Sequence, residues 1–288
     1  MPAESETADM CSVILEPQEP SCNDGLAYWV ASSATVESPL SEIPALREAP
    51  FPVGAPSLPG RFLRHSDEHT VVGMRAVLEA IAHFPDPRPS FEAFGVVGSP
   101  CLPGRMASAR TLMQLQAEGP ATVSPHIVPQ CSLHALASAV SVGLSMHGPN
   151  IGIGGGPEAM AEGFITSLSL LDHSDMPGLW LVFTEWNNEP TLDAQGIAPP
   201  DAMCRGVALC LMPTQRGAAR LALTLPSTRL ASDSDARTTP QATGTLAELA
   251  HTLAACKQGD VRADWLHVCP WGAHVRISHD RARDGENS

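Results

Sequence analysis

Positive charge is the scarcest property of this sequence. Its 288 residues include 17 Lys and Arg against 31 Asp and Glu, which gives a net charge of −14 at pH 7. Nucleic-acid and anionic-membrane surfaces are bound by stripes of basic residues, so the composition argues against both partners. An acidic protein partner would need a local basic patch. Arg61, Arg64, Arg75 and Arg105 are the candidates, although we interpret each as solvated surface charge.

Long apolar runs and paired cysteines are also missing. A membrane-spanning helix needs about 20 apolar residues, and the longest such stretch, residues 168–183, is interrupted by two aspartates and a proline. The acidic N-terminus does not resemble a secretory signal. The eight cysteines contain no CxxC pair, which is typical of reduced, structural thiols. We therefore expect a soluble, cytoplasmic protein, and its 43% hydrophobic content predicts a substantial core.

The hydrophobic pattern predicts one domain between two tails. Residues 1–24 form a disordered acidic tail, residues 25–278 the domain, and residues 279–288 a frayed end. A polar linker is predicted over residues 227–241, and a hairpin-like turn over residues 213–218. We predict strands over residues 26–36, 94–97, 150–153, 179–184, 207–212 and 220–225. We predict helices from a Ser66 cap to residue 84 and over residues 105–116, 131–146, 157–171 and 246–256.

Strands that alternate with helices and are apolar on both faces indicate an α/β fold. In such a fold a mixed central sheet is covered by helices on both faces. Right-handed crossovers bring the loops at the carboxyl ends of the parallel strands to one edge of the sheet. We therefore expect a functional site at that edge.

The segment from Gly148 to Glu158 reads Gly-Pro-Asn-Ile-Gly-Ile-Gly-Gly-Gly-Pro-Glu and is the most informative part of the chain. It predicts a short strand, a tight glycine turn and the start of a helix, a junction where many enzymes place a nucleophile or bind a phosphate. It is neither a P-loop, because no Lys-Ser/Thr follows, nor a GxGxxG motif, because Pro157 occupies the third glycine position. No Cys, Ser, Thr or Lys stands where the helix begins.

Two other side-chain groups could in principle support chemistry. Cys131 and His134 lie three residues apart on a predicted helix, but two ligands are too few for a metal, so we expect no metal site. Cys131 is also the only cysteine near a predicted helix start, where the helix dipole would acidify a thiol. Glu158 lies in the first turn of its predicted helix, where a capping role is the simpler interpretation.

The order of the segments resembles the N-terminal domain of the β-ketoacyl synthases, which have a thiolase-like fold. The resemblance covers about residues 45–225 and is closest to the chain-length-factor-like members. Its motifs are Ser124-Pro125, the Ala/Ser-rich segment after His134, Gly148-Pro149, the helix over residues 157–171, and Glu189-Pro190. The resemblance implies half of a thiolase-like fold.

The sequence departs from the active members of that family at the catalytic residues. In the active members the strand after Gly-Pro ends in Ala-Cys, whereas this chain has Gly156, Pro157 and Glu158. The two histidine motifs of the active members have no counterpart either. Condensation needs a thiolate to carry the acyl chain and imidazoles to stabilise charge. The comparison therefore implies a degenerate elbow without the Cys-His-His set, no catalytic residue and no cofactor.

The resemblance implies a non-catalytic subunit in fatty acid or polyketide biosynthesis of the aryl-polyene type. Its partner would be an active ketosynthase or a second copy of itself, and an acyl carrier protein is a further candidate. In the family the strand after Gly-Pro pairs across a two-fold axis, which implies an interface at Asn150, Ile151, Gly152 and Ile153. The alternative from another class is a divergent acyltransferase or thioesterase that uses Cys131 or Glu158.

Overall fold

The computed structural model describes residues 26–214, 217, 219–225 and 244–279. The predicted tail over residues 1–24 and the linker over residues 227–241 lie outside them. The frayed end predicted from residue 279 lies outside them as well, except for His279, which pairs with Ala219. The elements are β1 (Leu26–Pro39), α1 (Ile43–Glu48), α2 (Glu68–Ala82), β2 (Gly95–Pro100), α3 (Arg105–Glu118), the 3-10 turn η1 (Pro120–Thr122), α4 (Ile127–Gln130), α5 (Ala135–Gly143), β3 (Asn150–Gly152), α6 (Ala159–Asp172), β4 (Leu179–Trp186), β5 (Met203–Met212), β6 (Ala219–Thr224), α7 (Leu246–Lys257), β7 (Asp264–Val268) and β8 (His274–His279).

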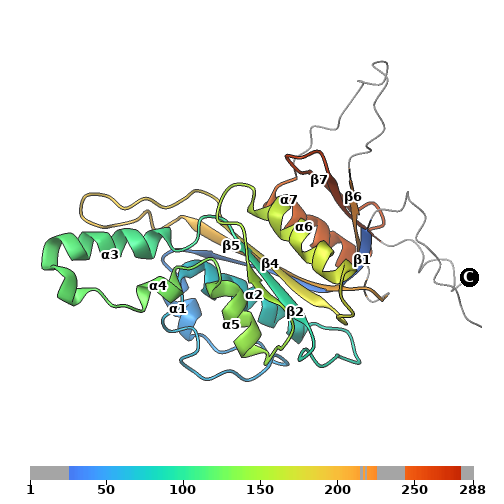
Figure 1. The fold of residues 1–288 in the computed structure, drawn as a ribbon, viewed down its shortest axis with the longest axis horizontal. Coiled ribbons are helices and arrows are strands. Elements are labelled where there is room, and N and C mark those ends of the chain that lie inside the picture. Colours follow the sequence, from blue (N-terminus) through green and yellow to red (C-terminus); the bar gives the residue numbers. More distant parts are fainter. Residues whose placement is uncertain (1–25, 215–216, 218, 226–243, 280–288) are drawn as a thin grey trace, which may run out of the picture.

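The eight described strands form one mixed sheet in the order β3-β2-β4-β5-β1-β6-β8-β7. β2 runs parallel to β3 and β4, and the remaining neighbours are antiparallel. Helices α1, α2 and α5 lie on one face and α6 and α7 on the other (Figure 1). The expected mixed sheet with helices on both faces is therefore confirmed.

Alternation along the central strands divides the core into two layers. On β4, Leu181 and Phe183 belong to the layer under α6 and α7, whereas Trp180 and Val182 belong to the layer under α2 and α5. All four side chains are 0–2% exposed. Because successive residues of a strand point to opposite faces, a strand covered on both faces is apolar throughout.

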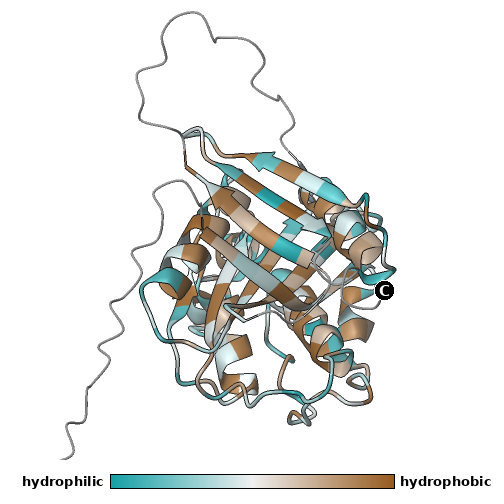
Figure 2. Cartoon of the chain, turned by 90° about the vertical axis from the view of Figure 1, so that its right-hand side faces the viewer, coloured by the Kyte–Doolittle hydropathy of each residue, from teal (hydrophilic) through white to brown (hydrophobic). Residues whose placement is uncertain are grey.

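The three strands at the far end are built differently. β6, β8 and β7 pack one face against α7, and along each of them buried side chains alternate with half-buried or exposed ones. Figure 2 looks at this end of the sheet, where the strands carry alternating apolar and polar bands. Sequence reasoning missed β7 and β8 because both are short and mix charged residues and histidine with apolar ones.

Two predicted local features are wrong. The hairpin between β5 and β6 does not form, because β1 lies between them and pairs with β5 on one edge and β6 on the other. Ser66 does not cap α2; Asp67 does, and its carboxylate accepts a hydrogen bond from the Thr70 N–H at 2.9 Å. Asp67 follows Ser66 directly, and its carboxylate accepts from a first-turn N–H that has no partner within the helix.

The predicted helix over residues 131–146 is interrupted. Cys131 ends α4, and α5 starts only at Ala135. The residues between them pack tightly: a Cβ added to Gly104 would lie 2.5 Å from the Cβ of Cys131, and one added to Gly152 would collide with the Leu133 carbonyl. These tertiary contacts select a turn where the sequence alone favours a helix.

Candidate functional site

The glycine elbow lies at the carboxyl edge of the sheet, beside the end of β2. β3 ends at Gly152, and α6 begins at Ala159. The Ile153 N–H donates to the Gly98 carbonyl at 3.0 Å, and the Gly155 N–H donates to the Pro100 carbonyl at 2.9 Å. Backbone hydrogen bonds to β2 therefore fix the turn at the edge where the site was expected.

Different physical constraints apply at the glycine positions of the elbow. Gly154 and Gly155 have φ values of +93° and +90°, which side chains with a Cβ rarely adopt. Gly152 has no room for a Cβ against the Leu133 carbonyl. Gly156 is under neither constraint, because a Cβ placed there would meet nothing within 4 Å. Position 156 is therefore the open position of the elbow: a side chain would fit there, but the residue is glycine.

The first residues of α6 offer no nucleophile. Glu158 is the N-cap residue and is exposed, and its carboxylate makes no capping hydrogen bond. Pro157 precedes the cap, so the prediction that it occupies the first helical position is wrong. The elbow and the start of α6 thus present glycine, proline and an exposed carboxylate.

Two thiols lie at this edge of the sheet, and neither is activated. Cys101 directly follows β2, and burial, with the charges of Glu185 and Glu189, raises the pKa of its thiol. Burial, with the charge of Asp67, raises the pKa of Cys131. A raised pKa keeps a thiol protonated near neutral pH, and the protonated form is the weaker nucleophile.

The structure changes the setting of Cys131 and His134. Cys131 caps the C-terminus of α4 and His134 the N-terminus of α5, so they do not share a helix face as predicted. Cys131 is therefore not at a helix start, which removes the dipole argument for its reactivity. In the described part of the chain no group of three or more His, Cys, Asp or Glu side chains could hold a metal ion.

A buried histidine behind the edge was missed by sequence reasoning. His69 shares a hydrogen bond of 2.8 Å between its Nδ1 and the Thr184 hydroxyl, and its ring lies edge-on to Trp186 with centroids 5.9 Å apart. Burial lowers the pKa of His69 to about 4, so the ring is neutral near pH 7. Its Nε2 is buried without a partner among the described residues. A polar residue in the first turn of α2 was the only signal in the sequence, and it gave no indication of the Thr184 contact.

Arg75 is not part of a basic surface patch. It is 4% exposed and donates to the carbonyls of Pro50, Leu46 and Ala49, with its guanidinium 4.6 Å from the centre of the Phe51 ring. The interpretation of Arg75 as solvated charge is therefore wrong.

Arg105, another of the predicted candidates, faces Glu189 at 3.8 Å. Arg61 and Arg64 remain exposed.

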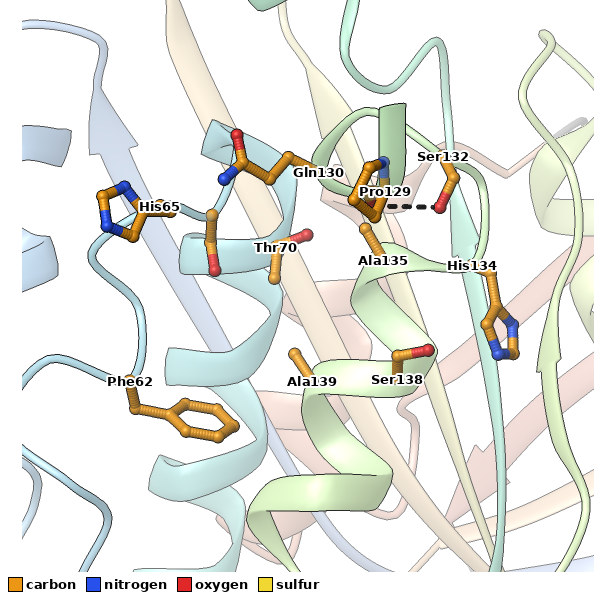
Figure 3. Close-up of a pocket in the computed structure, with 11 residues that line it drawn as sticks. Phe62, His65, Thr70, Pro129, Gln130, Ser132, His134, Ala135, Ser138 and Ala139 are labelled. Atoms are coloured by element: carbon orange, nitrogen blue, oxygen red, sulfur yellow. Dashed lines mark hydrogen bonds between the residues drawn. The ribbon is translucent and has the colours of Figure 1, made fainter. Parts of the chain in front are cut away.

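A cavity of about 330 Å³ lies between α2, α5 and the chain that returns from α4 (Figure 3). It does not include the elbow. The only side-chain hydrogen bond between its lining residues joins the Ser132 hydroxyl to the Pro129 carbonyl at 3.1 Å. Neither of its imidazoles is hydrogen-bonded to a hydroxyl or thiol in the described structure, so the cavity holds no paired nucleophile and base. Its polar lining consists of His65, Ser66, Thr70, Gln130, Ser132, His134 and Ser138.

Comparison with known proteins gives structural matches only. No protein-family model matches the sequence, and the search of curated proteins finds no match. The chain is similar to a chain of the ishigamide ketosynthase/chain length factor, with a TM-score of 0.53 and 15% identity over 88% of this chain and 99% of that one. It is also similar to a chain of a ketosynthase in complex with its chain length factor from Xenorhabdus doucetiae, with a TM-score of 0.51, 14% identity and the same two coverages.

The fold is ketosynthase-like. The similarity covers 88% of this chain and 99% of each compared chain. Within the described residues no helix is both long and apolar enough to cross a membrane.

Proposed function

We propose that this chain is a non-catalytic, chain-length-factor-like subunit that pairs with an active ketosynthase in fatty acid or polyketide biosynthesis of the aryl-polyene type. The elbow carries this proposal: a ketosynthase-like fold forms the strand–turn–helix junction, and its open position is Gly156, followed by Pro157 and Glu158. Without a thiol no acyl-enzyme forms there. The two structures compared above contain a ketosynthase together with a chain length factor, by their descriptions.

The free edge of β3 supports pairing. Among the described strands β3 bonds only to β2, and Asn150, Ile151, Gly152 and Ile153 are all half-buried. A strand with one unpaired edge offers free N–H and C=O groups to another chain. We propose these four residues as the interface with the ketosynthase. An acyl carrier protein would reach the resulting pair rather than this chain alone.

The alternative, an acyltransferase or thioesterase, has weaker support. Cys131 ends a four-residue helix, its thiol pKa is raised, and no imidazole bonds to it in the described structure. Glu158 is exposed at the elbow and has no described hydrogen-bonded partner to tune it. In the described structure neither side chain is hydrogen-bonded to an imidazole that could act as the base of a nucleophile.

The test uses the purified chain, alone and mixed with a ketosynthase from the same organism. Alone, the chain is expected to form no covalent adduct with acyl or malonyl thioesters by intact mass, and to release no CO2 from malonyl carrier protein. With the ketosynthase it is expected to form a stable complex in sedimentation. Cys131→Ala should leave complex formation and product formation by the pair unchanged. An adduct on the wild-type chain that is lost in Cys131→Ala or Glu158→Gln would establish the enzymatic alternative instead.

A further inference from the structure

One segment of the chain stands away from the body of the protein. Residues 105–134, called the arm below, contain α3, η1, α4 and the turn before α5. In Figure 1 α3 projects beyond the sheet and α4 leads the chain back. Met106 is the only fully buried residue of the arm, at 3% exposure. A helix of 14 residues without a packed face is marginal in water, so the arm lacks the contacts that normally hold a helix.

The arm is anchored at its base and carries a single charged residue beyond Arg110. Arg105 faces Glu189 at 3.8 Å and Arg110 faces Glu68 at 3.5 Å, and both carboxylates belong to the body. Glu118 is the only Asp, Glu, Lys or Arg among residues 111–134, in a chain of which 17% of residues are charged. Depletion of charge is the compositional signature of the centre of a protein–protein interface.

The arm also exposes apolar side chains. Leu112 is 63% exposed, Leu115 39%, Val128 74% and Leu133 39%, so the arm holds four of the ten exposed large hydrophobic residues in the described chain. Leu112 and Leu115 are three residues apart on α3 and share a face. Exposed apolar side chains on one segment of low charge indicate a site of association.

The arm is continuous with the free edge of β3. Leu133, on its return leg, lies against two glycines: a Cβ on Gly152 would collide with its carbonyl, and one on Gly155 would lie 2.6 Å from its side chain. The return leg of the arm therefore adjoins the edge strand and the turn after it. We propose that the arm folds over the same ketosynthase subunit that pairs with β3, with Leu112, Leu115 and Val128 buried against an apolar part of it.

This inference rests on the proposed function, and the charges select between partners. Carrier proteins are acidic, and the arm beyond Arg110 has no Lys or Arg to offer one. The occupant is therefore the ketosynthase rather than the carrier protein.

The test measures the dissociation constant of the complex with the ketosynthase. The double variant Leu112→Ser/Leu115→Ser is expected to weaken it at least 10-fold while the isolated chain keeps its circular dichroism and melting temperature. Val261→Ser removes an apolar side chain of similar exposure, 44%, before β7 at the other end of the sheet, and is expected to stay within 2-fold of wild type.

Hydrogen exchange of the wild-type chain gives a second measurement, which does not depend on how any variant folds. The amides of α3 should exchange fast in the free chain and at least 10-fold more slowly with the ketosynthase. They should be unaffected by carrier protein alone. If wild type binds the ketosynthase and both readings show no effect, the arm proposal is wrong while the proposed function stands. Wild type that binds no ketosynthase refutes the proposed function, and an arm effect confined to self-association refutes the choice of partner.

Discussion

Two helices of nearly equal length show what holds this protein together and what it leaves unpartnered. In α2, thirteen of the fifteen residues are buried, including two at its charged and polar N-terminus, Glu68 and His69. In α3, one of fourteen is buried. Intrinsic propensity would favour α3, because α2 contains His, Thr, three Val, Gly and Ile, so propensity does not explain the difference. The core stabilises α2, whereas α3 has almost no contact with it, and on our proposal the ketosynthase covers α3.

The largest expected effect tests this contrast directly. Leu78→Ala in α2 removes a side chain that is 0% exposed and should cost about 3 kcal/mol of unfolding free energy. Leu112→Ala in α3 removes the same atoms from a side chain that is 63% exposed and should change the stability of the isolated chain by less than about 0.5 kcal/mol. Urea unfolding of both variants checks the prediction. Equal losses would show that α3 is packed after all.

An intermediate effect is expected where the arm meets the body. Gly152→Ala forces a Cβ against the Leu133 carbonyl and should cost about 2 kcal/mol in thermal or urea unfolding. Gly156→Ala, four residues later in the same elbow, meets nothing within 4 Å and should stay within about 0.5 kcal/mol of wild type. A similar result for both would mean that Leu133 does not fix the arm against β3.

The smallest expected effect concerns the buried end of α2 and its response to pH. The pKa of His69 is lowered to about 4 from 6.5, so the unfolded chain binds the proton more tightly. The free energy of unfolding is therefore unaffected by His69 above pH 6.5, and it decreases as the pH falls from 6.5 toward 4, because protonation of the unfolded chain favours unfolding. Between pH 7 and 5.5 the loss should be about 1 kcal/mol.

His69→Gln isolates this contribution. The pKa values of Asp67 and Glu185 are raised, and their effect on stability has the opposite sign, but both carboxyls remain in the variant. The variant should therefore lose about 1 kcal/mol less than wild type over the same pH interval in urea titrations. Identical pH dependence in the two proteins would contradict a buried, neutral His69.

The sequence predicted the parts of the fold that local patterning controls. The helices α3, α6 and α7 and the strands β4 and β5 agree with the predictions to within a few residues, because each has a periodic apolar pattern or clear end signals. The elbow was also predictable, since three consecutive glycines between a short strand and an amphipathic segment favour a turn there. That no catalytic residue occupies the elbow stays a prediction until the thioester experiments are done.

The features that failed depend on contacts distant in the sequence. Nothing local shows that β1 enters between β5 and β6, which is why the hairpin prediction was wrong. The sequence pattern around Cys131 is helical, but the helix is interrupted where Cys131 packs against Gly104. The link between His69 and Thr184 joins residues 115 positions apart. The arm could not be recognised because exposure is a property of the folded chain, although its low charge was visible in the sequence.

The position of β1 sets the order in which the sheet can be completed during synthesis. β1 is the first described strand, yet the strands that flank it come much later: Trp29 pairs with Met212 and with Arg220. During synthesis β2, β3 and β4 leave the ribosome before β5 and β6, the two neighbours of β1. Both edges of this 14-residue strand therefore stay unpaired during that time. Such closure between distant segments is slow and leaves the nascent chain open to wrong pairing. A growing chain of this kind has reason to be shielded until its middle strand is enclosed.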